Sequence, residues 1–149
     1  MMQQKNNLIY GCLFGQAIGD ALGLGTEFMS KAELANNYPT GLTEYHQIIK
    51  DYHRSIFQPG AWSDDTDMMI CIANAMIQDS KINLHTIAKN FQDWAHAPEA
   101  CGVGQTTYKV LAFADYTEKP QQAAELIWRM SRKEMQLTGR LCALQLSDS

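Results

Sequence analysis

The sequence predicts an all-α protein. Apolar residues recur at helical spacing in several stretches, no stretch alternates like a β-strand, and residues that typically begin or end helices flank the periodic stretches. The chain has 149 residues, of which 46 % are apolar and 19 % charged, enough for one ordinary domain with a real core.

A first helix is predicted over residues 6–24. It carries one glycine per turn, and each costs about 1 kcal/mol relative to alanine in a helix interior. We therefore expect this stripe to pack closely against another helix. Asp20 lies beside the stripe, where an acid is either solvated or aimed into a cleft. The stripe consists of Gly11, Gly15, Gly19 and Gly23.

Residues 25–60 predict an irregular connection, with Pro39 and Gly41 marking a turn. A connection of that length is usually functional or mobile. From Asp65 onward the helical spacing returns, and Asn83 is a candidate cap for the next helix.

Two further helices are predicted from the glycine and proline residues that precede or begin them. Gly102 and Gly104 form a glycine loop that enters a further helix, and Pro120 occupies the expected first turn of the last one.

The formal net charge is −4, and lysine and arginine are scattered, which argues against a nucleic-acid partner. The four cysteines have no close pairing, and we expect buried thiols in a reducing compartment. The N-terminal apolar stretch is too polar for a signal peptide and too short for a membrane span. We therefore expect a soluble, cytoplasmic protein without a membrane partner.

The stretch "PGAWSDDTDMMI" places three acids, Asp64, Asp65 and Asp67, directly before an apolar helix. Acids in a first turn complement the helix dipole, and a serine or aspartate is an expected cap. Three acids with Ser63 and Thr66 exceed what capping requires, and a divalent cation would relieve their repulsion. Oxygen ligands of this kind suit Mg²⁺, Mn²⁺ or Ca²⁺. On these residues alone, the cap and the metal site are equally open.

The Asp-Asp-x-x-Asp motif of all-α prenyl-diphosphate enzymes is a rival interpretation. Here the third acid is Asp67, one position too early, so its carboxylate would lie on a different side of the helix. This spacing disfavours a diphosphate site.

Three segments together resemble the ADP-ribosylglycohydrolase family. "GCLFGQAIGDALGLGTEF" is similar to its opening helix, "WSDDTDM" to its Thr/Ser-Asp-Asp-Thr motif, and "CGVGQTTYKVL" to its glycine-rich loop and following helix. Their order and separation also fit, and the resemblance covers nearly all of residues 7–131.

The resemblance implies an orthogonal multi-helix bundle around two Mg²⁺ (or Mn²⁺) ions. It implies hydrolysis of the glycosidic bond between ADP-ribose and an acceptor, in an ADP-ribosylated protein or a small ADP-ribosyl compound. Ser63, Asp64 and Asp65 would be metal ligands, with both aspartates catalytic. Glu27 would be catalytic and would orient water or the ribose. Gly102 and Gly104 would let the backbone approach ADP-ribose.

The chain departs from the family after residue 132. Members are about twice as long, and a second Asp-x-Asp-Thr/Ser motif near their C-terminus completes the metal centre. We expect residues 1–132 to be the N-terminal part of one such domain and residues 133–149 to be a non-family tail. Permitted codons for the tail, shifted by one base, can spell a family-like continuation, so a frameshift is our hypothesis. Reading the coding DNA decides it.

Three functions follow as alternatives. The first is a Mg²⁺-dependent ADP-ribosyl hydrolase, with activity lost or weakened in a truncated chain. The second is a non-catalytic module of the same fold that binds ADP-ribose or a partner. The third is the disfavoured diphosphate enzyme. In a truncated bundle, exposed helix faces would favour self-association.

Overall fold

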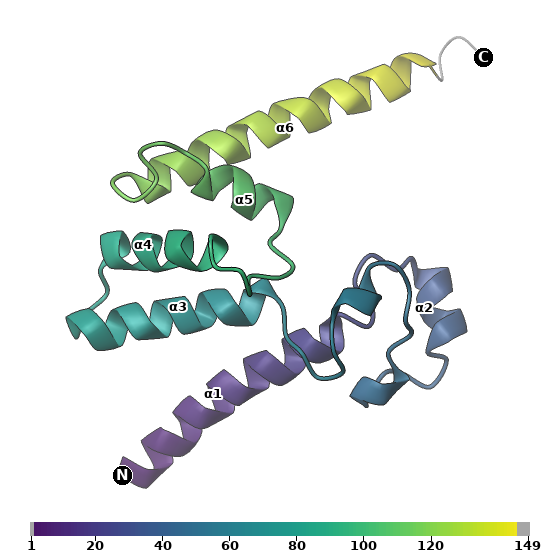
Figure 1. The fold of residues 1–149 in the computed structure, drawn as a ribbon. Helices are drawn as coiled ribbons and strands as arrows, with labels where there is room; N and C mark the ends of the chain where they lie inside the picture. Colours follow the sequence, from purple (N-terminus) through teal and green to yellow (C-terminus); the bar gives the residue numbers. More distant parts are fainter. Residues whose placement is uncertain (1, 146–149) are drawn as a thin grey trace. The chain divides into compact units, whose positions relative to one another are not determined.

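The computed structural model describes the backbone of residues 2–145 and the side chains of residues 3–132. Within residues 2–145 it contains six α-helices, two short 3₁₀ helices and no strand, which confirms the all-α prediction (Figure 1). The chain divides into two compact units, Met1–Ile70 and Cys71–Ser149, and each is described by itself.

The first unit contains four helices and the beginning of a fifth: α1 (Met2–Gly23), α2 (Lys31–Asn37), η1 (Tyr45–Gln47), η2 (Arg54–Ile56) and the first turns of α3 (Asp64–Asp79). Cys12 on α1 is exposed, which corrects the expectation of a buried thiol there. Within the first unit, the glycine stripe does not pack against another helix as predicted. In the described part of this unit, no heavy atom other than those of the nearby α1 backbone lies within 4 Å of a Cβ placed at any of the four glycines.

Helix α2 corrects the prediction that residues 25–60 are irregular. Ser30 caps it, with the Glu33 amide donating to Ser30 Oγ at 3.2 Å and the Ser30 amide donating to Glu33 Oε2 at 2.8 Å. This capping box satisfies two amides that a helix start would otherwise leave unpaired. The predicted turn after α2 is present, because the Gly41 amide donates to the Tyr38 carbonyl at 3.0 Å with φ of 91° at Gly41.

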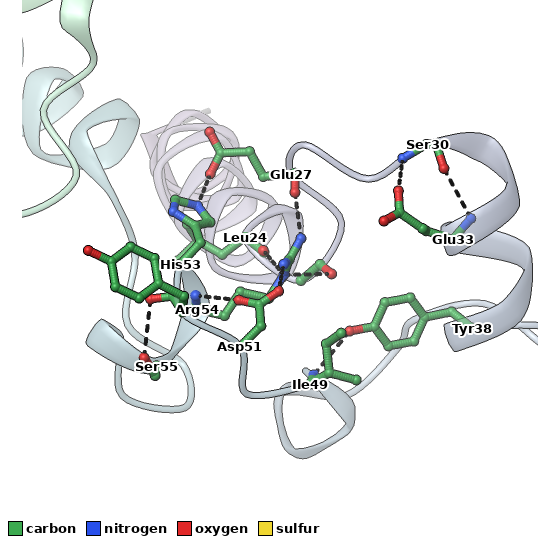
Figure 2. A network of polar contacts seen from close by, with 12 residues as sticks. Leu24, Glu27, Ser30, Glu33, Tyr38, Ile49, Asp51, His53, Arg54 and Ser55 are labelled. Atoms are coloured by element: carbon green, nitrogen blue, oxygen red, sulfur yellow. Dashed lines mark hydrogen bonds and ion pairs between the residues drawn. The ribbon is translucent and has the colours of Figure 1, made fainter.

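A buried arginine closes the end of α1 (Figure 2). Arg54 is only 7 % exposed, and its Nε donates to the carbonyls of Leu24, at 3.0 Å, and Gly25, at 3.2 Å. These carbonyls lie at a helix end, where no intrahelical partner is available. Asp51 accepts hydrogen bonds from both the backbone and the guanidinium of Arg54. These hydrogen bonds of Arg54 hold the segment around η2 against the turn that follows α1.

The second unit contains the rest of α3, α4 (Leu84–Ala95), α5 (Gln105–Leu111) and α6 (Pro120–Gln145). The predicted starts are confirmed: Asn83 caps α4 by accepting from the His85 amide at 3.2 Å, and Pro120 is the first residue of α6. Helices α4, α5 and α6 contact one another. Their buried centre consists of Ala88, Leu111, Tyr116 and Ala123, flanked by Phe91, Trp94, Ala95 and Val110.

The predicted tail begins inside α6. Its backbone is helical as far as Gln145, whereas the tail's side chains and residues 146–149 lie outside the described residues. No helix in the described part of the chain combines the length and the apolar character needed to cross a bilayer.

Candidate active site

The first unit contains a cavity of about 490 Å³ between the C-terminal half of α1 and the start of α3. All of the predicted metal ligands, and Glu27, line this cavity. Three glycines of the stripe line it as well, so the positions without side chains border an open cavity and not a packed helix of this unit. The lining residues are Gly15, Gln16, Gly19, Asp20, Gly23, Leu24, Glu27, Ser63, Asp64 and Asp65.

Asp20 holds the N-terminus of α3 against α1. Its Oδ2 accepts from the amides of Ser63 and Thr66, each at 3.0 Å. The two hydroxyls also donate to its carboxylate, both at 2.6 Å. Ser63 and Thr66 are both buried, so a carboxylate of α1 caps α3 from a distance in the sequence. The sequence left this acid either solvated or aimed into a cleft, and the structure places it in the cleft wall.

The carboxylates of the cavity repel one another. Burial, followed by the charges of Asp64, Asp20 and Glu27, raises the pKa of Asp65. At Asp20 burial also acts to raise the pKa, but the hydrogen bonds from Ser63 and Thr66 outweigh it and hold the pKa below its ordinary value. Asp20 therefore stays anionic, and burial and the neighbouring negative charges disfavour the ionised form of Asp65.

The donor chemistry of the cavity suits a hard divalent cation. The Ser63 hydroxyl donates its proton to Asp20, which leaves its oxygen lone pairs available to a metal. Carboxylate and hydroxyl oxygens are the ligands that Mg²⁺ and Mn²⁺ prefer. Among the residues that the structure describes, however, no three His, Cys, Asp or Glu side chains gather closely enough to hold a metal. The metal assignment of Ser63, Asp64 and Asp65 therefore stays a prediction.

The third acid of the cluster is engaged elsewhere. Trp62 Nε1 donates to Asp67 Oδ1 at 2.9 Å, and Asp67 does not line the cavity. Asp67 therefore does not share this cavity with the predicted metal ligands.

Glu27 is held by two neighbouring residues of the segment around η2. His53 Nε2 lies 2.9 Å from Glu27 Oε2, and Arg54 Nη2 donates to the Glu27 carbonyl (Figure 2). Sequence reasoning assigned no role to His53, because nothing in the local pattern around it indicates a partner 26 residues away. Glu27 and His53 also line a second cavity of the first unit, of about 360 Å³.

Gly102 and Gly104 belong to the second unit. Gly102 has φ of 78°, a conformation that favours glycine, and Gly104 is the N-cap residue of α5. The predicted loop before a helix is thus present, and its contact with ADP-ribose stays a prediction.

A sequence model of the ADP-ribosylglycohydrolases matches residues 1–139. The chain belongs to the ADP-ribosylglycohydrolase family. It is 30 % identical over 93 residues to the uncharacterized protein YegU of Escherichia coli K12, which is 61 % of this chain and 28 % of that protein.

Two further relatives have names that state a reaction. ADP-ribosylarginine hydrolase Tri1 of Serratia proteamaculans is 31 % identical over 84 residues, 56 % of this chain and 20 % of Tri1. ADP-ribosyl-[dinitrogen reductase] glycohydrolase of Rhodospirillum rubrum is also 31 % identical over 84 residues, 56 % of this chain and 27 % of that protein. The matched part of the chain thus spans less than a third of each of these relatives. No solved structure matches the chain.

Proposed function

We propose that the cavity of the first unit belongs to a Mg²⁺- or Mn²⁺-dependent hydrolase that cleaves the glycosidic bond between ADP-ribose and an acceptor. One observation carries this proposal: Ser63, Asp64 and Asp65, at the start of α3, line the same cavity as Glu27, which lies in the turn after α1. The raised pKa of Asp65 supports it, because a cation would offset the surrounding negative charge.

The proposed roles follow from the chemistry of these side chains. Ser63, Asp64 and Asp65 would hold the metal, which when bound supplies polarisation of a water or of ribose hydroxyls. Glu27 would orient the attacking water or the ribose. The negative charge of the cavity would favour an oxocarbenium-like transition state at the anomeric carbon. Gly102 and Gly104 would let the backbone approach ADP-ribose.

The names of two relatives support an ADP-ribosylated protein as substrate, since one is named for ADP-ribosylarginine and the other for ADP-ribosyl-dinitrogen reductase. A small ADP-ribosyl compound would present the same glycosidic bond to the cavity. An assay with an ADP-ribosylated protein and with ADP-ribosylarginine distinguishes the two.

The test is calorimetry of the full chain with Mg²⁺, Mn²⁺ and ADP-ribose, together with measurement of ADP-ribose release. We expect Asp64→Asn combined with Asp65→Asn to weaken metal binding by at least about tenfold. Asp67→Asn is the matched control, because this adjacent carboxylate accepts from Trp62 instead. Unchanged metal affinity in the double variant would remove the ligand assignment.

A non-catalytic module is the second candidate function. It is favoured by the observation that no three potential ligands converge within the described residues. Binding of ADP-ribose without its release from a modified protein would support the module, and release would exclude it. Binding of neither metal nor ADP-ribose would overturn the hydrolase and the ADP-ribose-binding form of the module.

A further inference from the structure

We infer that His53 is a positioning residue that holds the Glu27 carboxylate at the wall of the candidate-site cavity. Its effect on catalysis rests on the proposed function, whereas the contact itself does not. The basis is the distance of 2.9 Å between His53 Nε2 and Glu27 Oε2. An ionised carboxylate only accepts hydrogen bonds, so Nε2 is the donor of this pair.

The backbone of Glu27 is fixed from the same segment. Arg54, the next residue, donates through Nη2 to the Glu27 carbonyl and through Nε to the Leu24 and Gly25 carbonyls. Figure 2 shows both contacts reaching Glu27 from the segment around η2. Because the buried Arg54 holds the backbone of Glu27, only the side chain of Glu27 remains free to rotate. The contact with His53 restricts this rotation.

The imidazole of His53 is itself held by two aromatic rings. The Phe28 ring lies edge-on at 5.1 Å between ring centroids, and the Phe57 ring lies edge-on at 6.1 Å. Phe28 directly follows Glu27 and has φ of 61°, a conformation that residues other than glycine rarely adopt. The turn that places Glu27 at the cavity therefore also places the Phe28 ring against His53, the residue that contacts the Glu27 carboxylate.

Glu27 needs such support because charge opposes its position. It lines the cavity together with Asp20, Asp64 and Asp65, and carboxylates that share one cavity repel one another. Glu27 also borders the second cavity, where Glu33 and Asp51 are further acids of the lining. A donor at His53 lowers the cost of keeping a further anion beside them, since hydrogen bonds to a charged acceptor are strong.

The experiment compares His53→Phe, which keeps an aromatic ring but removes the donor, with His53→Gln, whose side-chain amide can replace Nε2. We expect His53→Phe to lower kcat for ADP-ribose release by about 10- to 100-fold, with little change in KM and in melting temperature. His53→Gln should restore most of the rate. His46→Phe is the matched control, because it removes another imidazole of the same unit.

A double-mutant cycle tests whether His53 acts through Glu27. In a Glu27→Ala background, His53→Phe should cause no further loss of rate, because its target is already absent. Losses that multiply, or wild-type kcat in His53→Phe, would overturn the inference.

A third readout separates this inference from the proposed function. The ¹⁵N chemical shift of His53 Nε2 in the full chain should change in Glu27→Ala, whether or not the chain is active. A changed shift without ADP-ribose release would remove the hydrolase proposal and leave the contact in place. An unchanged shift would show that the pair does not form, and the inference would fail.

Discussion

Asp20 shows how much a single side chain decides in the first unit. Its carboxylate accepts hydrogen bonds from the backbone amides and the hydroxyls of Ser63 and Thr66, which lie 43 and 46 residues later in the chain. These bonds orient the turn that carries Asp64 and Asp65. They also place Asp20 in the cavity wall, so one residue both caps a helix and contributes negative charge to the candidate site.

We expect Asp20→Ala to lower the free energy of unfolding by about 2 kcal/mol, because it removes a distant helix cap and leaves buried donors unpaired. Urea denaturation followed by circular dichroism measures the change. Asp93→Ala is the control, since Asp93 makes an exposed pair with Lys89 and should cost no more than about 0.5 kcal/mol. Equal small losses in the two variants would contradict the capping role.

At the scale of the elements, glycine has two different uses in the first unit. The stripe of α1 borders open space, and three of its members line the cavity. Gly25, just beyond α1, is where the chain is crowded. A Cβ there would lie 2.4 Å from Leu42 Cδ2 and 3.0 Å from Ile48 Cγ1. The close packing expected along the stripe therefore occurs at its end.

Alanine substitutions at these glycines should have opposite effects. Gly25→Ala should destabilise the protein by about 1–3 kcal/mol, because the new methyl group overlaps packed side chains. Gly11→Ala should stabilise it by up to about 1 kcal/mol, because the helix interior gains alanine without a clash. Thermal unfolding of the two variants measures both. Destabilisation by Gly11→Ala would show that the stripe is packed after all.

The junction of α3 and α4 predicts a pH dependence. Asp79 accepts from Thr86 Oγ1 at 2.6 Å and from Asn83 Nδ2 at 2.7 Å, and these bonds lower its pKa in the folded state. Because the pKa of Asp79 is lower in the folded state, its ionisation stabilises the fold at pH values above the ordinary aspartate pKa of 3.8. This stabilisation is lost as the pH falls through the pKa of the folded state. The difference in unfolding free energy between wild type and Asp79→Asn should therefore shrink with acidification.

Denaturation curves at a series of acidic pH values measure this difference. Thr86→Val should behave like Asp79→Asn, because it removes the largest contribution to the pKa shift. A difference that stays constant below the ordinary aspartate pKa would rule out the linkage.

At the scale of the whole molecule, each unit buries few large side chains. Ala21, Leu24 and Tyr38 are the buried hydrophobic residues of the first unit in the described part of the chain. Large apolar side chains remain exposed on α1, with Leu8 at 66 % and Phe14 at 64 % exposed. Apolar surfaces of this kind favour association.

We therefore expect the chain to self-associate, with a sedimentation coefficient that rises with concentration. Leu8→Ser combined with Phe14→Ser should weaken the association, because it removes two large apolar groups from α1. Ile82→Ser is the control, since Ile82 is 71 % exposed outside the helices. A sedimentation coefficient independent of concentration in the wild-type chain would contradict the expectation.

The sequence by itself determined the all-helical class, the starts of α4 and α6, the acidic first turn of α3 and the family. Such features are readable because helical periodicity and capping depend on residues within a turn or two of one another. The Ser30–Glu33 capping box was readable in the same way, and the irregular prediction for its segment overlooked that signal.

Only the tertiary structure decided which residues surround the candidate site. The contacts of Asp20 with Ser63, of His53 with Glu27 and of Arg54 with Leu24 join residues 26 to 43 positions apart. No local pattern specifies such partners, because they meet only when α1 and the segments after it have packed. The same packing makes three glycines of the stripe part of a cavity wall. The sequence could not show this, because a glycine borders either a packed helix or an open cavity depending on which segment folds against it.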